Sequence, residues 1–254
     1  MANSHEGKCN NPNNLENIAY KEIKGYFTSP MAYVVALTFV SLTGYFFVRS
    51  VDSALSGANF PEASLRDMFL QISIFILPWL APVLTMRLLA EEQKMGTIEL
   101  LLTSPVRDWE VVLGKFIACM TFFIGALALT LWYVLMLVWR GNPEVGPLLS
   151  GYLGIILYGS VGISLGLLAS SLTSNQIVAA VVSLGALVLL SFLEVAANQV
   201  TGLSSTIVAQ MGLTTHFDDF IRGVIDTSNV VYYISMTTVF LFLTIRSLEA
   251  RRWR

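Results

Sequence analysis

Six stretches of the chain are almost entirely apolar, and most of its charged residues fall in the segments between them. A bilayer core about 30 Å thick is crossed by a helix of roughly 17–25 apolar residues, so each stretch is long enough, or nearly so, to span a membrane. The predicted spans cover residues 31–48, 68–90, 116–139, 148–170, 177–193 and 230–245. The pattern therefore predicts an all-α integral membrane protein with six transmembrane helices.

The composition strengthens this interpretation. Hydrophobic residues make up 55% of the 254 residues and charged residues only 13%, whereas soluble domains carry about 25% charged residues. A net charge of −2 gives no reason to expect a nucleic-acid partner. The two cysteines, Cys9 and Cys119, fall in a polar and an apolar segment, so we expect neither a disulfide nor a metal site. Residues 1–17 are polar and read as a disordered cytoplasmic tail ahead of one membrane domain, 18–254.

The distribution of lysine and arginine predicts how the helices are oriented, because these residues accumulate on the cytoplasmic side of membrane proteins. With the N-terminus in the cytoplasm, 11 of the 15 basic residues lie inside. They are Lys8, Lys21, Lys24, Arg87, Lys94, Arg107, Lys115, Arg246, Arg251, Arg252 and Arg254. The four others are Arg49, Arg66, Arg140 and Arg222. Both termini are therefore predicted to be cytoplasmic.

Residues 20–30, just before the first span, mix aromatic side chains with lysines. This mixture is typical of an interfacial helix that lies on a membrane surface. Because the residue before a proline resists the α conformation, the helix is expected to end before Pro30.

A charged seam, residues 87–107, separates the second span from the third. Thr97 is suited to cap a helix after Gly96, with Glu99 in the first turn near the positive end of the helix dipole. Ser104 and Pro105 are start signals for the next long helix. The sequence thus predicts a short helix over about 97–103. By itself it leaves two roles equally open: a docking surface for a partner, or an amphipathic connector with a solvated acidic face.

The seam carries a family resemblance. The pattern Glu-x-x-x-Gly-Thr-x-Glu, then Leu-Leu, Ser-Pro and Gly114-Lys115, resembles the permease subunits of ABC exporters of the ABC-2 type. In that family this stretch is a cytoplasmic coupling helix that docks on a separate ATPase subunit. The resemblance implies two ATPase copies, a second permease chain, identical or related, and a bacterial inner (plasma) membrane. The implied ATPase-coupling residues are Glu91, Glu92, Gly96, Thr97, Glu99, Leu100 and Leu101.

The segment between the fifth and sixth spans is not a simple hydrophilic linker. Residues 207–211 and 217–221 carry apolar residues at three- and four-residue spacing, which predicts short outer amphipathic helices. Thr215 is the expected cap of the second and Gly223 its end. The stretch 216–226 also resembles the permease associated with bacterial gliding motility. The group Phe217, Asp218, Asp219, Phe220, Ile221 and Arg222 is predicted to form an outer gate at a dimer interface or, alternatively, a cap over the ends of spans five and six.

Two further patterns concern the spans themselves. Pro78 and Pro82 lie in the second span and predict a hinge or, alternatively, a static kink. Gly162-x-x-x-Gly166 in the fourth span permits close helix approach. We expect internal packing there, with a subunit interface as the alternative.

No nucleotide site of its own is expected, because Gly114-Lys115 lacks the rest of a phosphate-binding loop. The chain is therefore predicted to be a non-catalytic permease subunit without a cofactor, whose partner ATPase binds ATP and magnesium. It would be coupled to that partner through residues 91–105. The alternative is a membrane subunit that transmits force to an outside partner protein, for motility or an envelope function, without moving a solute.

Overall fold

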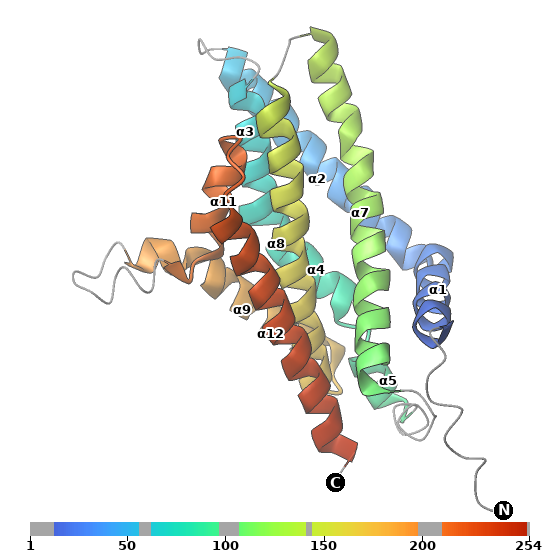
Figure 1. Cartoon of the computed structure of the whole chain (residues 1–254). Helices are drawn as coiled ribbons and strands as arrows, with labels where there is room; N and C mark the ends of the chain where they lie inside the picture. The colour runs from blue at the N-terminus through green and yellow to red at the C-terminus, as the bar shows by residue number, and fades with distance from the viewer. Residues whose placement is uncertain (1–12, 56–61, 97–106, 141–143, 198–209, 253–254) are drawn as a thin grey trace, which may run out of the picture.

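The structure, a computed structural model, describes residues 13–55, 62–96, 107–140, 144–197 and 210–252. Every regular element among them is helical (Figure 1). The elements are α1 (Asn13–Thr28), α2 (Pro30–Leu55), α3 (Glu62–Gln71), the π-helical η1 (Ile72–Ile76), α4 (Leu77–Thr85), α5 (Ala90–Lys94), α7 (Asp108–Arg140), α8 (Val145–Leu172), α9 (Gln176–Ala197), α11 (Leu213–Ile221) and α12 (Thr227–Arg252).

The expected all-α fold with six membrane-spanning helices is confirmed. Helices long and apolar enough to cross a membrane cover Pro30–Asp52, Leu65–Lys94, Asp108–Trp139, Val145–Leu172, Gln176–Leu193 and Thr227–Ala250. The predicted boundaries were too narrow, because polar and charged residues continue a helix beyond its apolar stretch. The last span is the clearest case: it was expected to end at residue 245, yet α12 runs on through an Arg246–Glu249 ion pair at 2.7 Å.

The chain turns sharply between α1 and α2. Helix α1 ends at Thr28 and α2 begins at Pro30, as the restriction on the residue before a proline predicts. The boundary of the predicted tail is wrong by a few residues, since α1 already begins at Asn13. Phe27 packs edge-on against Phe122 with ring centroids 6.0 Å apart, so α1 is attached to the side of α7.

The second span is irregular where the two prolines lie. Pro78 has no N–H to donate to the preceding turn, and the chain there forms η1, in which the Leu77 N–H donates to the Ile72 carbonyl instead. Pro82 lies inside α4. The predicted distortion is therefore present as a π-helical turn followed by a proline-containing helix, a common cause of helix bending. Whether it moves as a hinge stays a prediction.

Helix α8 is the centre of the bundle and packs against α4, α7, α9, α11 and α12. Its glycines make this possible. A Cβ atom on Gly162 would lie 3.0 Å from the Ala81 Cβ, and one on Gly166 would collide with the Thr85 hydroxyl. The Gly162-x-x-x-Gly166 motif therefore packs inside the chain, against α4, as expected.

The bundle has two distinct ends. Helix α5, helix α1, the start of α7 and the end of α12 lie at one end (Figure 1). The end of α7, the starts of α3 and α8, and α11 lie toward the other (Figure 1). The structure thus brings α1, α5 and the end of α12 to the same end of the molecule.

We predict that Gly166→Ala destabilises the protein, because its methyl group would overlap Thr85 and overpacking costs about 1–3 kcal/mol. Thermal unfolding of the purified chain in detergent, followed by circular dichroism, should show a lower midpoint. Gly185→Ala is the matched control, since its Cβ would meet no atom within 4 Å. Equal midpoints for the two variants would contradict close α4–α8 packing.

Candidate functional site

The seam begins where the second span breaks between α4 and α5. Over Met86–Leu89 the chain forms a turn rather than a helix, and the backbone N–H groups of Leu89 and Ala90 donate to a side chain from another helix. The acceptor is Ser170 Oγ at the end of α8, at 3.1 Å from Leu89 N and 3.0 Å from Ala90 N. Ser170 Oγ also donates to the Met86 carbonyl at 3.3 Å. One buried hydroxyl therefore caps α5 and fixes it to α8.

A second side chain strengthens the same contact. Gln93 Nε2, from α5, donates to the carbonyl of Ser171 at 2.9 Å and to that of Ser170 at 3.4 Å. These carbonyls lie in the last turn of α8, where the helix has no N–H partners of its own to offer. Helix α5 is thus joined to the end of α8 by hydrogen bonds that its first turn and the Gln93 side chain both donate.

On its other side, α5 takes part in a buried ion triad. Lys115 of α7 has a side chain only 3% exposed, and its Nζ lies 2.7 Å from Glu92 Oε1 of α5 and 2.9 Å from Glu22 Oε1 of α1. Burying a charged amine is costly unless it is paired and hydrogen-bonded. The triad Glu22–Lys115–Glu92 therefore favours one relative position of α1, α5 and α7.

The two other charged residues of α5 lie at the surface. Glu91 and Lys94 are exposed, and Gly96, with φ +69°, follows the helix in a conformation that favours glycine. Of the predicted coupling residues, the structure places Glu91 at the surface and Glu92 in the triad. Thr97, Glu99, Leu100, Leu101 and the predicted helix over 97–103 lie outside the described residues.

Sequence reasoning missed most of this site. Lys115 was counted as a cytoplasmic charge at the edge of the third span, although α7 begins at Asp108 and carries it inside the helix. Glu22, Gln93 and Ser170 gave no local signal, because their roles depend on residues more than 75 positions away. The one available clue was a lone lysine one residue before a long apolar stretch, with no acidic residue one turn away to pair with it.

At the other end, α11 presents a wholly buried apolar face. Leu213, Phe217 and Phe220 are 0% exposed and Ile221 is 2% exposed. The Phe217 ring packs edge-on against Tyr158 of α8 at a centroid distance of 6.0 Å, and Gly154 leaves the space that both phenylalanines occupy. These contacts are made within one chain, and this packing favours the cap interpretation over a gate at a dimer interface.

The polar face of α11 is fixed to α12. Asn229 donates through Nδ2 to Asp219 Oδ2 at 2.8 Å, and its Oδ1 lies 2.7 Å from His216 Nδ1. Arg222 pairs with Asp218 at 3.1 Å, and both side chains are exposed. The expected cap was wrong: α11 begins at Leu213, so Thr215 lies inside it. Gly223, at φ +86°, follows the end of the helix as predicted. The other expected helix, 207–211, lies largely outside the described residues.

The bundle of apolar helices and the seam at one end define a multi-pass membrane protein of the transporter-permease class. The model of the ABC-2 family of transporter proteins matches residues 16–252, and the chain belongs to that family. The chain is thus a multi-pass membrane protein of that family. The resemblance to the gliding-motility permease stays a prediction.

The chain is also similar to curated proteins that are named as ABC transporter permeases. The chain is 28% identical over 180 residues to the probable multidrug ABC transporter permease YbhS of Escherichia coli K12, and equally to that of Escherichia coli O157:H7. The match covers 66% of this chain and 47% of each relative, so the chain spans about half the length of the curated relatives it matches.

We predict strong coupling between the two carboxylates of the triad. Glu22→Gln or Glu92→Gln alone leaves Lys115 one carboxylate partner, whereas the double variant leaves the buried lysine with neither. The free energy of unfolding of the double variant should therefore fall by about 3 kcal/mol or more. Unfolding midpoints of the wild type, both single variants and the double variant form a double-mutant cycle. Asp218→Asn with Glu249→Gln is the control pair, since both residues are in exposed ion pairs. Additive effects in the triad would show that Lys115 does not depend on both acids.

We also predict that Phe217→Ala destabilises the chain by about 3–5 kcal/mol, because it removes a fully buried ring. A cysteine at position 217 should then form no disulfide with its counterpart in a second copy under oxidising conditions. Val224→Ala, an exposed residue just beyond α11, is the control for stability. Efficient 217–217 crosslinking that stops transport would favour the gate and contradict the cap.

Proposed function

We propose that this chain is the transmembrane subunit of an ATP-driven ABC exporter and is coupled to a separate ATPase through residues 91–105. The observation that carries the proposal is the double attachment of α5. Ser170 and Gln93 join it to α8, and Glu92 joins it to α1 and α7 through Lys115.

This arrangement suits a part that receives a push and passes it on. Helix α5 has five residues, and helices this short have little stability of their own. The position of α5 is instead set by its contacts to α8 and, through Lys115, to α7 and α1. A displacement of the seam by a docked ATPase therefore strains contacts to α8 and to α7 together, and α8 is the helix against which most others pack.

The exposed groups supply the docking chemistry. Glu91 is exposed on α5, and Glu99 with Leu100 and Leu101 follow it in the seam. Acidic residues beside leucines complement a partner groove that is apolar inside and basic at its rim. Two permease chains and two ATPase subunits would then make the complete transporter.

We further propose that the seam is cytoplasmic and that the protein resides in a bacterial inner membrane. Support comes from the distribution of basic residues. Arg87 and Lys94 lie just before or on α5, Arg107 and Lys115 at or near the start of α7, and Arg246 near the end of α12. These parts of the chain lie at one end of the bundle (Figure 1). Positive charge on that end favours the cytoplasmic side.

We predict that Thr97→Ala and Glu99→Ala abolish stimulation of the partner's ATP hydrolysis while leaving the unfolding midpoint unchanged. Glu92→Gln should reduce both, because Glu92 also belongs to the triad. The measurement is ATP hydrolysis by the reconstituted complex, together with crosslinking from a cysteine at position 97 to the ATPase. Glu249→Ala, an exposed acid on α12, is the control. Normal stimulation and normal crosslinking in both variants would show that the seam is a passive connector.

Single cysteines at Lys94 and Ser228 should react with an impermeant maleimide from opposite sides of the membrane, since both positions are exposed and lie at opposite ends of the bundle. The background protein lacks Cys9 and Cys119. In spheroplasts, position 228 should label directly and position 94 only after permeabilisation. Labelling of both before permeabilisation would refute the proposed orientation.

A further inference from the structure

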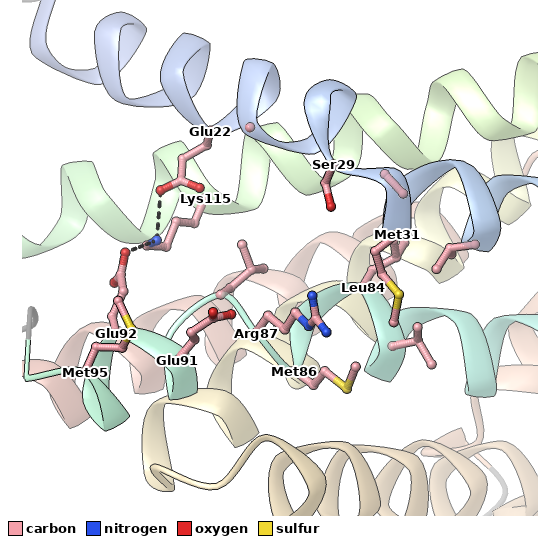
Figure 2. A pocket seen from close by; sticks show the side chains of 15 residues that line it. Glu22, Ser29, Met31, Leu84, Met86, Arg87, Glu91, Glu92, Met95 and Lys115 are labelled. Carbon is pink, nitrogen blue, oxygen red and sulfur yellow. Dashed lines mark hydrogen bonds and ion pairs between the residues drawn. The ribbon is translucent and has the colours of Figure 1, made fainter.

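A cavity of about 400 Å³ lies beside the triad, between the α1–α2 elbow and the α4–α5 turn (Figure 2). Its volume falls within the range of about 300–1,000 Å³ that is usual for small-ligand sites. Span Pro30–Asp52 begins beside the cavity. The α4–α5 turn, near the end of span Leu65–Lys94, forms the other wall. The cavity therefore lies at the depth where lipid headgroups meet the ends of these two spans.

One end of the cavity is charged. Arg87 extends into it from the α4–α5 turn (Figure 2). Among the described residues its guanidinium takes part in none of the ion pairs. Glu91 lies one helical turn further along and also lines the cavity. The Arg87 guanidinium and the Glu91 carboxylate therefore offer a ligand one positive and one negative contact.

The opposite wall is apolar and reaches the membrane-facing surface. It is formed by Met31, Val35, Val83 and Leu84. Met31 and Val83 are 39% and 36% exposed, so they form a rim rather than a sealed core. A ligand that fits both walls is an amphiphile with a charged head and an aliphatic tail.

The balance of charge selects the kind of head. Two basic and three acidic side chains line the cavity, a formal net charge of −1. An anionic head would meet this acidic excess, and a purely cationic head would leave Arg87 without a counter-ion. A zwitterionic head satisfies both: its phosphate accepts from the Arg87 guanidinium, and its ammonium donates to Glu91.

We infer that this cavity binds one phospholipid with a zwitterionic, primary-amine headgroup, its acyl chain running along Met31 and Val83. The lipid joins α1 and α2 to the α4–α5 turn, so it adds a contact to the segment that the triad already positions. A primary ammonium is favoured over a quaternary one because only the former donates hydrogen bonds to a carboxylate.

The binding experiment uses the delipidated full chain in detergent and native mass spectrometry. Dioleoyl-phosphatidylethanolamine, -phosphatidylcholine and -phosphatidylglycerol are titrated separately. We expect the first molecule of phosphatidylethanolamine bound per chain to have an affinity about tenfold higher than the first molecule of phosphatidylglycerol. A tenfold difference corresponds to about one hydrogen bond to a charged group. Glycerophosphoethanolamine, the same head without acyl chains, should fail to displace it at equal concentration.

Three variants test the site. Arg87→Ala should weaken first-lipid binding about tenfold, and Glu91→Gln should remove the preference for phosphatidylethanolamine. Gly25→Leu should block the cavity without a clash, because Gly25 lines it and a Cβ there meets no atom within 4 Å. Lys94→Ala and Gly185→Leu are matched controls outside the cavity and should bind as the wild type does.

Several results would overturn the inference. They are a preference for phosphatidylglycerol, full displacement by the chain-free head, or first-lipid binding that Arg87→Ala and Gly25→Leu both leave unchanged in folded protein. Binding is measured on this chain without its ATPase, so such a failure leaves the proposed coupling function untouched. Loss of coupling with normal lipid binding would equally leave the lipid site standing.

Discussion

The position of the seam depends on one buried cation. Lys115 lies inside α7 with a side chain 3% exposed, and the carboxylates of Glu22 and Glu92 offset the cost of that burial. Each carboxylate comes from a different element, so the lysine attaches both α1 and α5 to the third span. The two acids are 29% and 28% exposed, so they keep contact with solvent while the lysine between them is almost fully buried.

The second constraint is steric. Helix α8 approaches its neighbours closely at its glycines, and at Gly166 the neighbour is Thr85, one residue before the turn that leads into α5. Four residues further along α8, Ser170 caps α5 itself. A single helix thus sets both the distance of α4 and the start of α5, which is why the break in the second span needs no proline or glycine of its own.

Features that depend on local sequence could be predicted, and features that depend on distant contacts could not. Apolar length predicted the six spans, Pro30 predicted the end of α1, and the glycine at position 223 predicted the end of α11. Lys115 escaped prediction because its partners are 93 and 23 positions away. The apolar period of α11 predicted a helix but not what would bury its apolar face. Tyr158 and Gly154, which are both on α8, form the surface that buries this face.

The two attachments of α5 differ in kind, and the difference bears on how the seam would respond to a partner. The contacts to α8 are hydrogen bonds to the Ser170 hydroxyl and to the last carbonyls of that helix. Hydrogen bonds are short-range, so these are lost over a displacement of about one ångström. The contact to α7 is an ion triad whose attraction falls off more gradually with distance. A force on α5 should therefore release it from α8 before it releases it from Lys115. In that order α5 would pivot about Glu92 with α1 and α7, and the end of α8 would become free to move.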